Sequence, residues 1–223
     1  MLTTFDLKTR VSFPQVTTKA AAENGFYLLE SPEGETSTAA EEALSFAESE
    51  AARAFAKVLA DDRHRLSVDE RIAVAGFVAL QAVRTDHVRA QLDELAAGLA
   101  KAMPAAFTSA TLGSSRSAHI GVMFEVLRPA IERLAVLEFG VLTFERRSLA
   151  TSDHPVLLVR QPTCPEDAER GTGILNADEI WLAISNRRAL VLAERVNAFA
   201  TTKLANWLNY HVADRARRWV YWH

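Results

Sequence analysis

Hydrophobic and polar positions follow two different periods along the chain, one helical and one strand-like. Residues 38–60 and 67–101 place apolar side chains three or four positions apart, which predicts two amphipathic helices. The second helix begins with a capping-box pattern, Ser67 followed by Glu70. Residues 118–139 have the same helical spacing, and the proline within them is expected to kink or restart the helix.

The period changes after this third helix. Residues 140–194 contain short runs of β-branched and apolar residues separated by turn residues, which predicts an antiparallel meander. Residues 197–222 return to helical spacing, and residues 1–30 predict an irregular β arm. Helices followed by strands indicate an α+β fold. We therefore predict a single domain over residues 1–223, with mainly a helical bundle over residues 38–138 and a small antiparallel β-sheet in the C-terminal half.

The composition is that of a globular protein. Of the 223 residues, 49% are hydrophobic and 24% are charged, and the formal net charge of -3 gives no strongly basic surface for nucleic acid. The longest apolar run is too short to span a bilayer, and no leader pattern begins the chain. Cys164 is the only cysteine, so no intrachain disulfide can form. We expect a soluble cytoplasmic protein, and the excess of arginine over lysine suggests a bacterial source.

Polar side chains interrupt the apolar faces of the first two helices. Glu41 and Glu48 share the apolar stripe of the first helix, and Gln81 and Arg84 share that of the second. Because an unpaired buried charge is costly, we expect Glu48, with Glu41 as a second candidate, to meet Arg84 and Gln81. Two interpretations are open. The cluster is a structural ion pair, or it is a site in which carboxylates act as acid and base or hold a metal while Gln81 and Arg84 bind the ligand.

The segment Thr-Ser-Asp-His-Pro, between two strand-like runs, supplies the other candidates. Asp153 suits a turn because its side chain can bond to nearby backbone, and Pro155 biases His154 towards an extended conformation. The alternative is that Asp153 or His154 is catalytic, although no serine or cysteine has the setting of a nucleophile motif. We expect the Asp153 carboxylate to shape the turn and to face the Glu/Arg cluster.

The remaining motifs favour structural roles. No two histidines stand three or four residues apart, as a helical metal pair would, so we predict no metal site and no cofactor. Residues 215–222 mix arginines with aromatic residues, as nucleic-acid surfaces do. A positively charged helix end explains this mixture without nucleic acid, and the net acidic charge disfavours nucleic-acid binding.

Taken in order, these motifs resemble those of the bacterial domain-of-unknown-function 4238 family. Its members show Phe-Tyr after an irregular β arm, two spaced glutamates on a helix, Arg-Thr-Pro on the next helix, Thr-Ser-Asp-Asn-Pro before a strand, and a strand ending near Pro-Leu-Ser. The corresponding positions here are Phe26, Tyr27, Glu41, Glu48, Gln81, Arg84, Thr85, Asp153, Pro155 and Ser185.

This chain departs from the family pattern in two places. Asp86 stands where the proline of Arg-Thr-Pro is expected, and the sequence starts at Met1 without the family's usual N-terminal His-Tyr-Val-Pro segment. The resemblance implies the fold and selects the residues above, but it implies no particular reaction.

Two functions of different classes remain open on the sequence alone. The first is an uncharacterised cytoplasmic protein that binds a protein partner or a small ligand where the bundle meets the sheet. The second is a hydrolase-type enzyme in which Glu41, Glu48 and Asp153 serve as acid and base or as metal ligands, while Arg84 holds a phosphate-containing or other anionic substrate.

Overall fold

The computed structural model describes residues 1–16, 29–30, 36–37, 39–61, 64–103, 115–162, 164 and 171–223. Its helices and strands, in chain order, are β1 (Leu2–Asp6), β2 (Val11–Gln15), β3 (Leu29–Glu30), β4 (Thr36–Ser37), α1 (Ala39–Ala60), α2 (Val68–Val83), α3 (Asp86–Ala102), α4 (Ser115–Ala135), β5 (Glu138–Thr143), β6 (Thr151–Ser152), β7 (Val156–Val159), β8 (Glu179–Ala183), β9 (Arg188–Ala193), α6 (Thr202–Arg215) and β10 (Trp219–Trp222).

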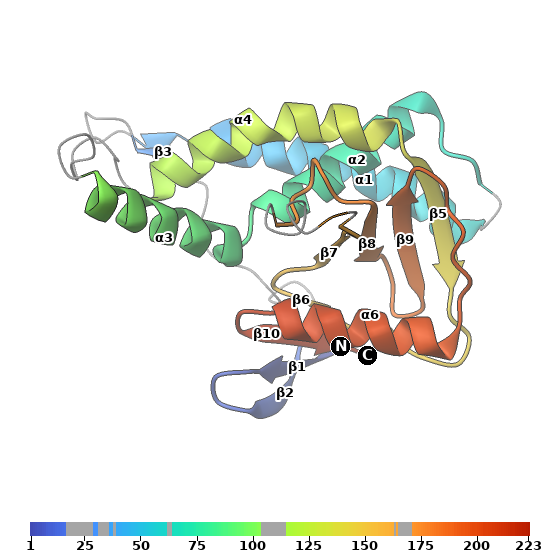
Figure 1. Ribbon diagram of the computed structural model, residues 1–223. Helices are drawn as coiled ribbons and strands as arrows, with labels where there is room; N and C mark the ends of the chain where they lie inside the picture. The colour runs from blue at the N-terminus through green and yellow to red at the C-terminus, as the bar shows by residue number, and fades with distance from the viewer. Residues whose placement is uncertain are drawn as a thin grey trace.

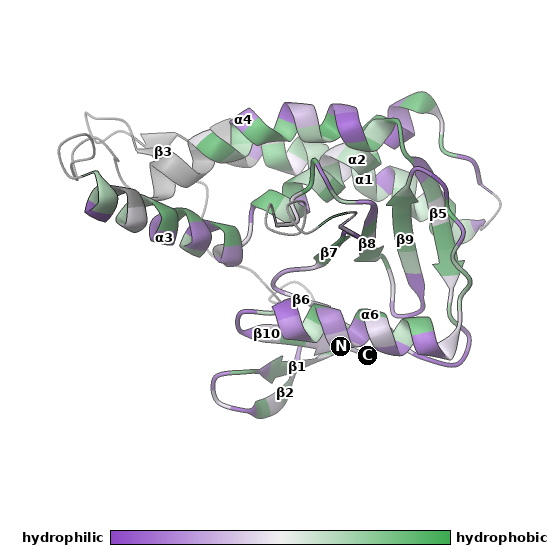
Figure 2. Ribbon diagram, viewed as in Figure 1, coloured by the Kyte–Doolittle hydropathy of each residue, from purple (hydrophilic) through white to green (hydrophobic). Residues whose placement is uncertain are grey.

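A four-stranded antiparallel sheet, in the order β5-β9-β8-β7, lies between two helical layers (Figure 1). Side chains alternate between its faces along each strand. Ile180 and Leu182 of β8 join the core beneath α1, α2 and α4, whereas Trp181 joins a second core beneath α6. Figure 2 shows hydrophobic residues along β8 and β9. This sheet is therefore buried on both faces and forms the centre of the fold.

The predicted α+β class is confirmed, but the predicted helical bundle with one small sheet is wrong. The described residues form five helices, two four-stranded antiparallel sheets and the short β3–β4 pair. The physical reason is that α1, α2 and α4 pack part of their apolar surface against the sheet instead of only against one another. That the chain forms a single domain stays a prediction.

The predicted long helix over residues 67–101 is two helices. α2 ends at Val83, and α3 starts at Asp86 after a corner at Arg84 and Thr85. Thr85 Oγ1 accepts a hydrogen bond from the backbone N–H of Val88 at 3.3 Å, which is an N-cap contact. Asp86 stands at the first helical position, and a proline, as in the family pattern, would suit the φ angle there. Thr-Asp was thus a readable signal for a new helix.

The predicted C-terminal helix also ends earlier than expected. α6 stops at Arg215, and the aromatic and β-branched residues Trp219–Trp222 form β10. β10 lies between β1 and β6 in a second sheet of order β2-β1-β10-β6, so the two termini of the chain lie together (Figure 1). The irregular β arm predicted for residues 1–30 therefore includes a hairpin, β1 and β2, that pairs with the C-terminal strand.

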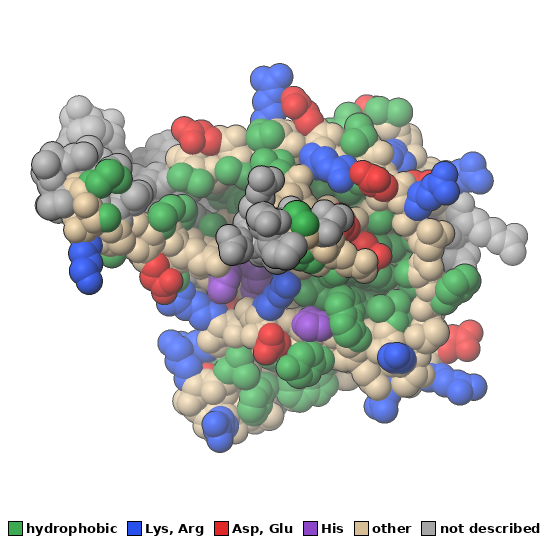
Figure 3. Space-filling model, in the orientation of Figure 1, with side chains coloured by type: hydrophobic (Ala, Val, Ile, Leu, Met, Phe, Trp, Pro, Cys, Tyr) green, Lys and Arg blue, Asp and Glu red, His purple; other side chains and the backbone are tan. Residues whose placement is uncertain are grey.

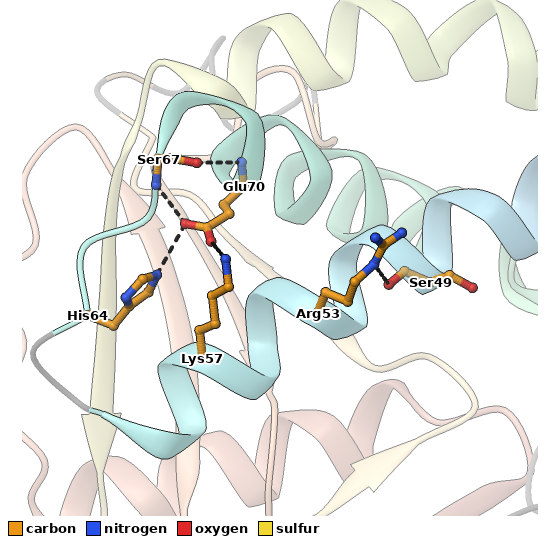
Figure 4. A network of polar contacts seen from close by, with 6 residues as sticks. All are labelled: Ser49, Arg53, Lys57, His64, Ser67 and Glu70. Atoms are coloured by element: carbon orange, nitrogen blue, oxygen red, sulfur yellow. Dashed lines mark hydrogen bonds and ion pairs between the residues drawn. The ribbon is translucent and has the colours of Figure 1, made fainter.

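The connection between α1 and α2 is held by one carboxylate (Figure 4). Glu70 accepts from the backbone N–H of Ser67 at 2.8 Å, while Ser67 Oγ accepts from the N–H of Glu70 at 3.3 Å, so the predicted capping box is confirmed. Lys57 and His64 also bond to the same carboxylate. The contacts with Lys57 and Ser67 lower the pKa of Glu70 from 4.5 to about 2, which keeps this connection charged in mild acid.

Candidate ligand-binding site

Three polar side chains meet where the α2–α3 corner approaches the β6–β7 turn, and a fourth lies nearby at the end of α6. We call them the junction site: Thr85, His87, His154 and Arg215. Thr85 is 5% exposed, whereas the two histidines and Arg215 are half-buried. Figure 3 shows histidine and basic side chains together in the middle of one face, between α3 and α6. The fold thus brings together residues that are up to 130 positions apart in the sequence, as between Thr85 and Arg215.

One hydrogen bond ties the turn of His154 to the helix corner. His154 Nδ1 lies 3.1 Å from Thr85 Oγ1. Thr85 Oγ1 already accepts from the backbone of Val88, so its hydroxyl hydrogen is free to donate to Nδ1. Donation from this hydroxyl to Nδ1 matches the neutral tautomer of His154 that carries its proton on Nε2. The contact therefore suits an uncharged His154.

The electrostatic surroundings also favour neutral His154. Burial, with the nearby basic groups His87 and Arg215, lowers the pKa of His154 from 6.5 to about 4. The His87 ring centre lies 5.0 Å from that of His154. Arg215 donates from Nη1 to the backbone oxygen of Leu158 at 2.9 Å, and burial lowers the pKa of its guanidinium although Asp214 opposes the shift. Basic groups from α3, the β6–β7 turn and α6 thus converge on one place.

The cluster predicted from the helical stripes forms next to this junction. Arg84 donates from Nη1 to Glu48 Oε1 and from Nε to Gln81 Oε1, the latter at 3.2 Å. The side chains of Arg84 and Glu48 are 22% and 41% exposed. The pair is therefore partly solvated instead of buried, while the side chain of Glu41 lies outside the described residues.

We expect the Glu48–Arg84 pair to contribute modestly to stability. Glu48→Gln and Arg84→Met should each lower the free energy of unfolding by about 1 kcal/mol, with a coupling of about 0.5 kcal/mol, because water screens a half-exposed pair. Urea unfolding of the two single variants and the double variant measures this. Single losses of about 3 kcal/mol that the double variant recovers would contradict the expectation and indicate a buried pair.

Asp153 does not face that cluster. Its carboxylate accepts from the backbone N–H groups of Arg217, Arg218 and Trp219 at 3.0, 2.7 and 3.0 Å. The local turn is instead held by Ser152, whose Oγ bonds to the backbone N–H and C=O of His154. Asp153 therefore fixes the start of β10 and turns its carboxylate away from His154 and Arg84.

A family model described as "Protein of unknown function (DUF4238)" matches residues 1–223. The chain belongs to the DUF4238 family. The predicted resemblance is thus confirmed over the whole length of the sequence. Comparison with curated proteins and with solved structures finds no match. In the described part of this DUF4238 protein, none of the helices is both long enough and apolar enough to cross a membrane.

Within the DUF4238 fold, the predicted residues fall into separate groups. Glu48, Gln81 and Arg84 meet as expected, whereas Asp153 serves the sheet of β10 and His154 joins the junction site. The described residues contain no group of three or more His, Cys, Asp or Glu side chains that could hold a metal ion.

Sequence reasoning missed two members of the junction site, His87 and Arg215. His87 could have been chosen as a candidate only by recognising that a helix starts after Thr85. That start places His87 in the first turn of α3, beside the N-cap. Arg215 was assigned to a solvated helix end, and the early end of α6 with the return of the chain in β10 placed it against β7 instead. Neither contact has a local sequence signal.

Proposed function

We propose that this DUF4238 protein binds a small anionic ligand at the junction site. The observation that supports this most is the convergence of His87, His154 and Arg215 from three separate elements. The two side chains whose charge would lower the pKa of His154 are both basic, His87 and Arg215. An anion is the kind of ligand that these basic side chains of the junction site would attract.

Positive charge in a half-buried place costs free energy unless an anion compensates for it, and Arg215 holds its guanidinium in such a place beside two imidazoles. A phosphate or carboxylate group would accept hydrogen bonds from the Arg215 guanidinium and from the imidazole N–H groups of His87 and His154. The N-terminus of α3, a helix of 17 residues, adds partial positive charge beside Thr85. Half-burial of the three basic side chains leaves them reachable from solvent and would strengthen these bonds relative to fully exposed ones.

The geometry supports binding more than hydrolysis. A hydrolase of the kind considered above needs a free carboxylate beside its anion site, yet the Asp153 carboxylate accepts three backbone N–H groups and Glu48 is paired with Arg84. A binding role uses the positive groups and requires no carboxylate.

We expect inorganic pyrophosphate to bind the protein measurably at pH 7 and low salt. Arg215→Gln should weaken binding about tenfold to a hundredfold, because a charge-assisted hydrogen bond contributes about 1.5–3 kcal/mol. Arg215→Lys, which keeps the charge, should retain part of the affinity. Isothermal titration calorimetry measures the dissociation constants, and thermal unfolding confirms that each variant is folded.

The matched control is Arg128→Gln on α4, which removes an equal charge from a side chain that is 87% exposed. It should leave pyrophosphate affinity unchanged to within about twofold, because Arg128 is not part of the junction site and solvent screens so exposed a charge. Absence of binding to the parent protein, or equal losses in Arg215→Gln and Arg128→Gln, would refute the proposal.

A further inference from the structure

Arg215 lies at one end of a stripe of cationic and aromatic side chains along α6. Trp207, His211 and Arg215 follow one another at four-residue intervals, so they lie on one side of the helix. We call these three residues the α6 stripe. The rings of Trp207 and His211 are in contact, with centres 4.5 Å apart at 61°. The ring of Tyr210, which is 65% exposed, meets the other side of His211 at 5.1 Å.

The stripe leads from an aromatic surface to the basic junction site. Trp207 is half-buried, since part of it packs against the core beneath α6 while the rest reaches the surface. Trp207 and Arg215 are eight residues apart on the helix, which separates their Cα atoms by roughly 12 Å. An extended nucleoside diphosphate has about this length from its base to its terminal phosphate. Figure 3 shows hydrophobic side chains beside the histidine and basic side chains over α6.

Both ends of such a ligand would find matching chemistry. The exposed phenol of Tyr210 and the partly exposed indole and imidazole of the α6 stripe offer flat surfaces on which a base can stack, whichever base it is. Arg215 and the two junction histidines offer charge and N–H donors to phosphate oxygens. The basic end of the α6 stripe alone would suit any small anion. The aromatic end, held about one nucleotide length away on the same helix, makes the stripe specific for a nucleotide.

We infer that the ligand is a nucleoside phosphate, held with its phosphates at the junction site and its base against Trp207 and His211. This inference rests on the proposed function, because it assigns the anionic part of the ligand to the same side chains. It adds a second contact, the aromatic end of the α6 stripe, which an inorganic anion cannot use.

Calorimetric titrations of the parent protein with ADP, GDP, CDP, UDP and inorganic pyrophosphate test the inference. At least one nucleoside diphosphate should bind about tenfold or more tightly than pyrophosphate, because a stacked base adds affinity of that order. Trp207→Leu should reduce the nucleotide's affinity to that of pyrophosphate and leave pyrophosphate binding unchanged. Arg215→Gln should weaken both.

The outcomes separate the two proposals. Pyrophosphate that binds as tightly as every nucleotide would overturn the nucleoside inference and leave the anion site in place. Failure of all five compounds to bind would overturn both proposals. A nucleotide advantage that survives in Trp207→Leu would also overturn the inference, since the base would then lie elsewhere.

A second measurement covers the case in which Trp207→Leu unfolds, because its side chain contributes to a core. Trp207→Phe keeps an aromatic ring in that position. The favoured nucleotide should quench part of the tryptophan fluorescence of the parent, and Trp207→Phe should abolish this quenching while binding is retained. Trp222→Phe on β10 is the matched control and should preserve the quenching. Quenching that persists in Trp207→Phe would overturn the inference.

Discussion

Asp153→Ala is expected to lower the free energy of unfolding by about 3 kcal/mol, since it leaves three backbone N–H groups without their charged acceptor. Those groups belong to Arg217, Arg218 and Trp219, 64 to 66 residues further along the chain. They open β10, which joins β1 to β6. The variant should therefore weaken the whole second sheet instead of one turn. Urea unfolding followed by circular dichroism measures the loss.

Two companion variants make this result specific. Asp153→Asn keeps one acceptor oxygen without the charge and should lose about half as much. Asp214→Ala, at an exposed position near the end of α6, removes an equal charge and should change stability by less than about 0.5 kcal/mol. Asp153→Ala with parental stability would contradict the structural role and return Asp153 to the list of residues kept for chemistry.

How far the sequence predicts this fold depends on whether the signal is local. The capping box of Ser67 and Glu70 is a short-range pattern, and it forms as expected. The stripe argument likewise placed Glu48 near Arg84, because helical spacing fixes which side chains share a face. Helical spacing does not predict how deeply the pair is buried, because burial depends on which other elements pack there. The Glu48–Arg84 pair is more exposed than we expected.

The errors arise where distant segments decide the outcome. Residues 219–222 are all large and apolar, and they follow a segment with helical spacing. Their local sequence therefore predicts that the helix continues. Pairing with β1, more than 200 residues away, makes them a strand instead. The Asp153 carboxylate was expected to make local bonds, and its partners come from that same distant strand. Once the second sheet is missed, neither the role of Asp153 nor the position of Arg215 can be predicted.

The junction site has the same origin. His154 was a candidate because of its position in a turn, and its partner Thr85 was identified only through the Arg-Thr motif of the family pattern. Their contact requires the corner between α2 and α3. The hydrophobic pattern of the sequence shows no sign of this corner, because the helical spacing of apolar residues continues without a break across it. The two proposals made above therefore depend on tertiary contacts, and the experiments on Arg215 and Trp207 test them independently of the sequence argument.

The stability of the parent protein should fall between pH 7 and pH 4 in a way that depends on His154. Its pKa is about 4 in the folded protein because of burial and the nearby His87 and Arg215, against 6.5 for an unperturbed histidine. Above pH 6.5 the group is neutral in both states and has no effect. As the pH falls from 6.5 towards 4 the unfolded chain alone takes up the proton, which favours unfolding, and below pH 4 the loss is complete.

The full loss corresponds to roughly 3 kcal/mol, because each pKa unit is about 1.4 kcal/mol. His154→Asn isolates it, since Asn can still bond to Thr85 and does not titrate, and Asn occupies this position in the family pattern described above. The variant should be slightly less stable than the parent at pH 7 and more stable at pH 4.5. Urea unfolding at half-unit pH steps measures the difference.

The crossing of the two curves is what distinguishes His154 from other acid-sensitive groups. Glu70 also loses stabilising contacts in acid, but its pKa of about 2 places that loss at lower pH and it is common to both proteins. Parallel curves for the parent and His154→Asn would refute the expectation. A bound anion at the junction site would favour the protonated histidine, so saturating pyrophosphate should bring the two curves closer together if the proposed site is correct.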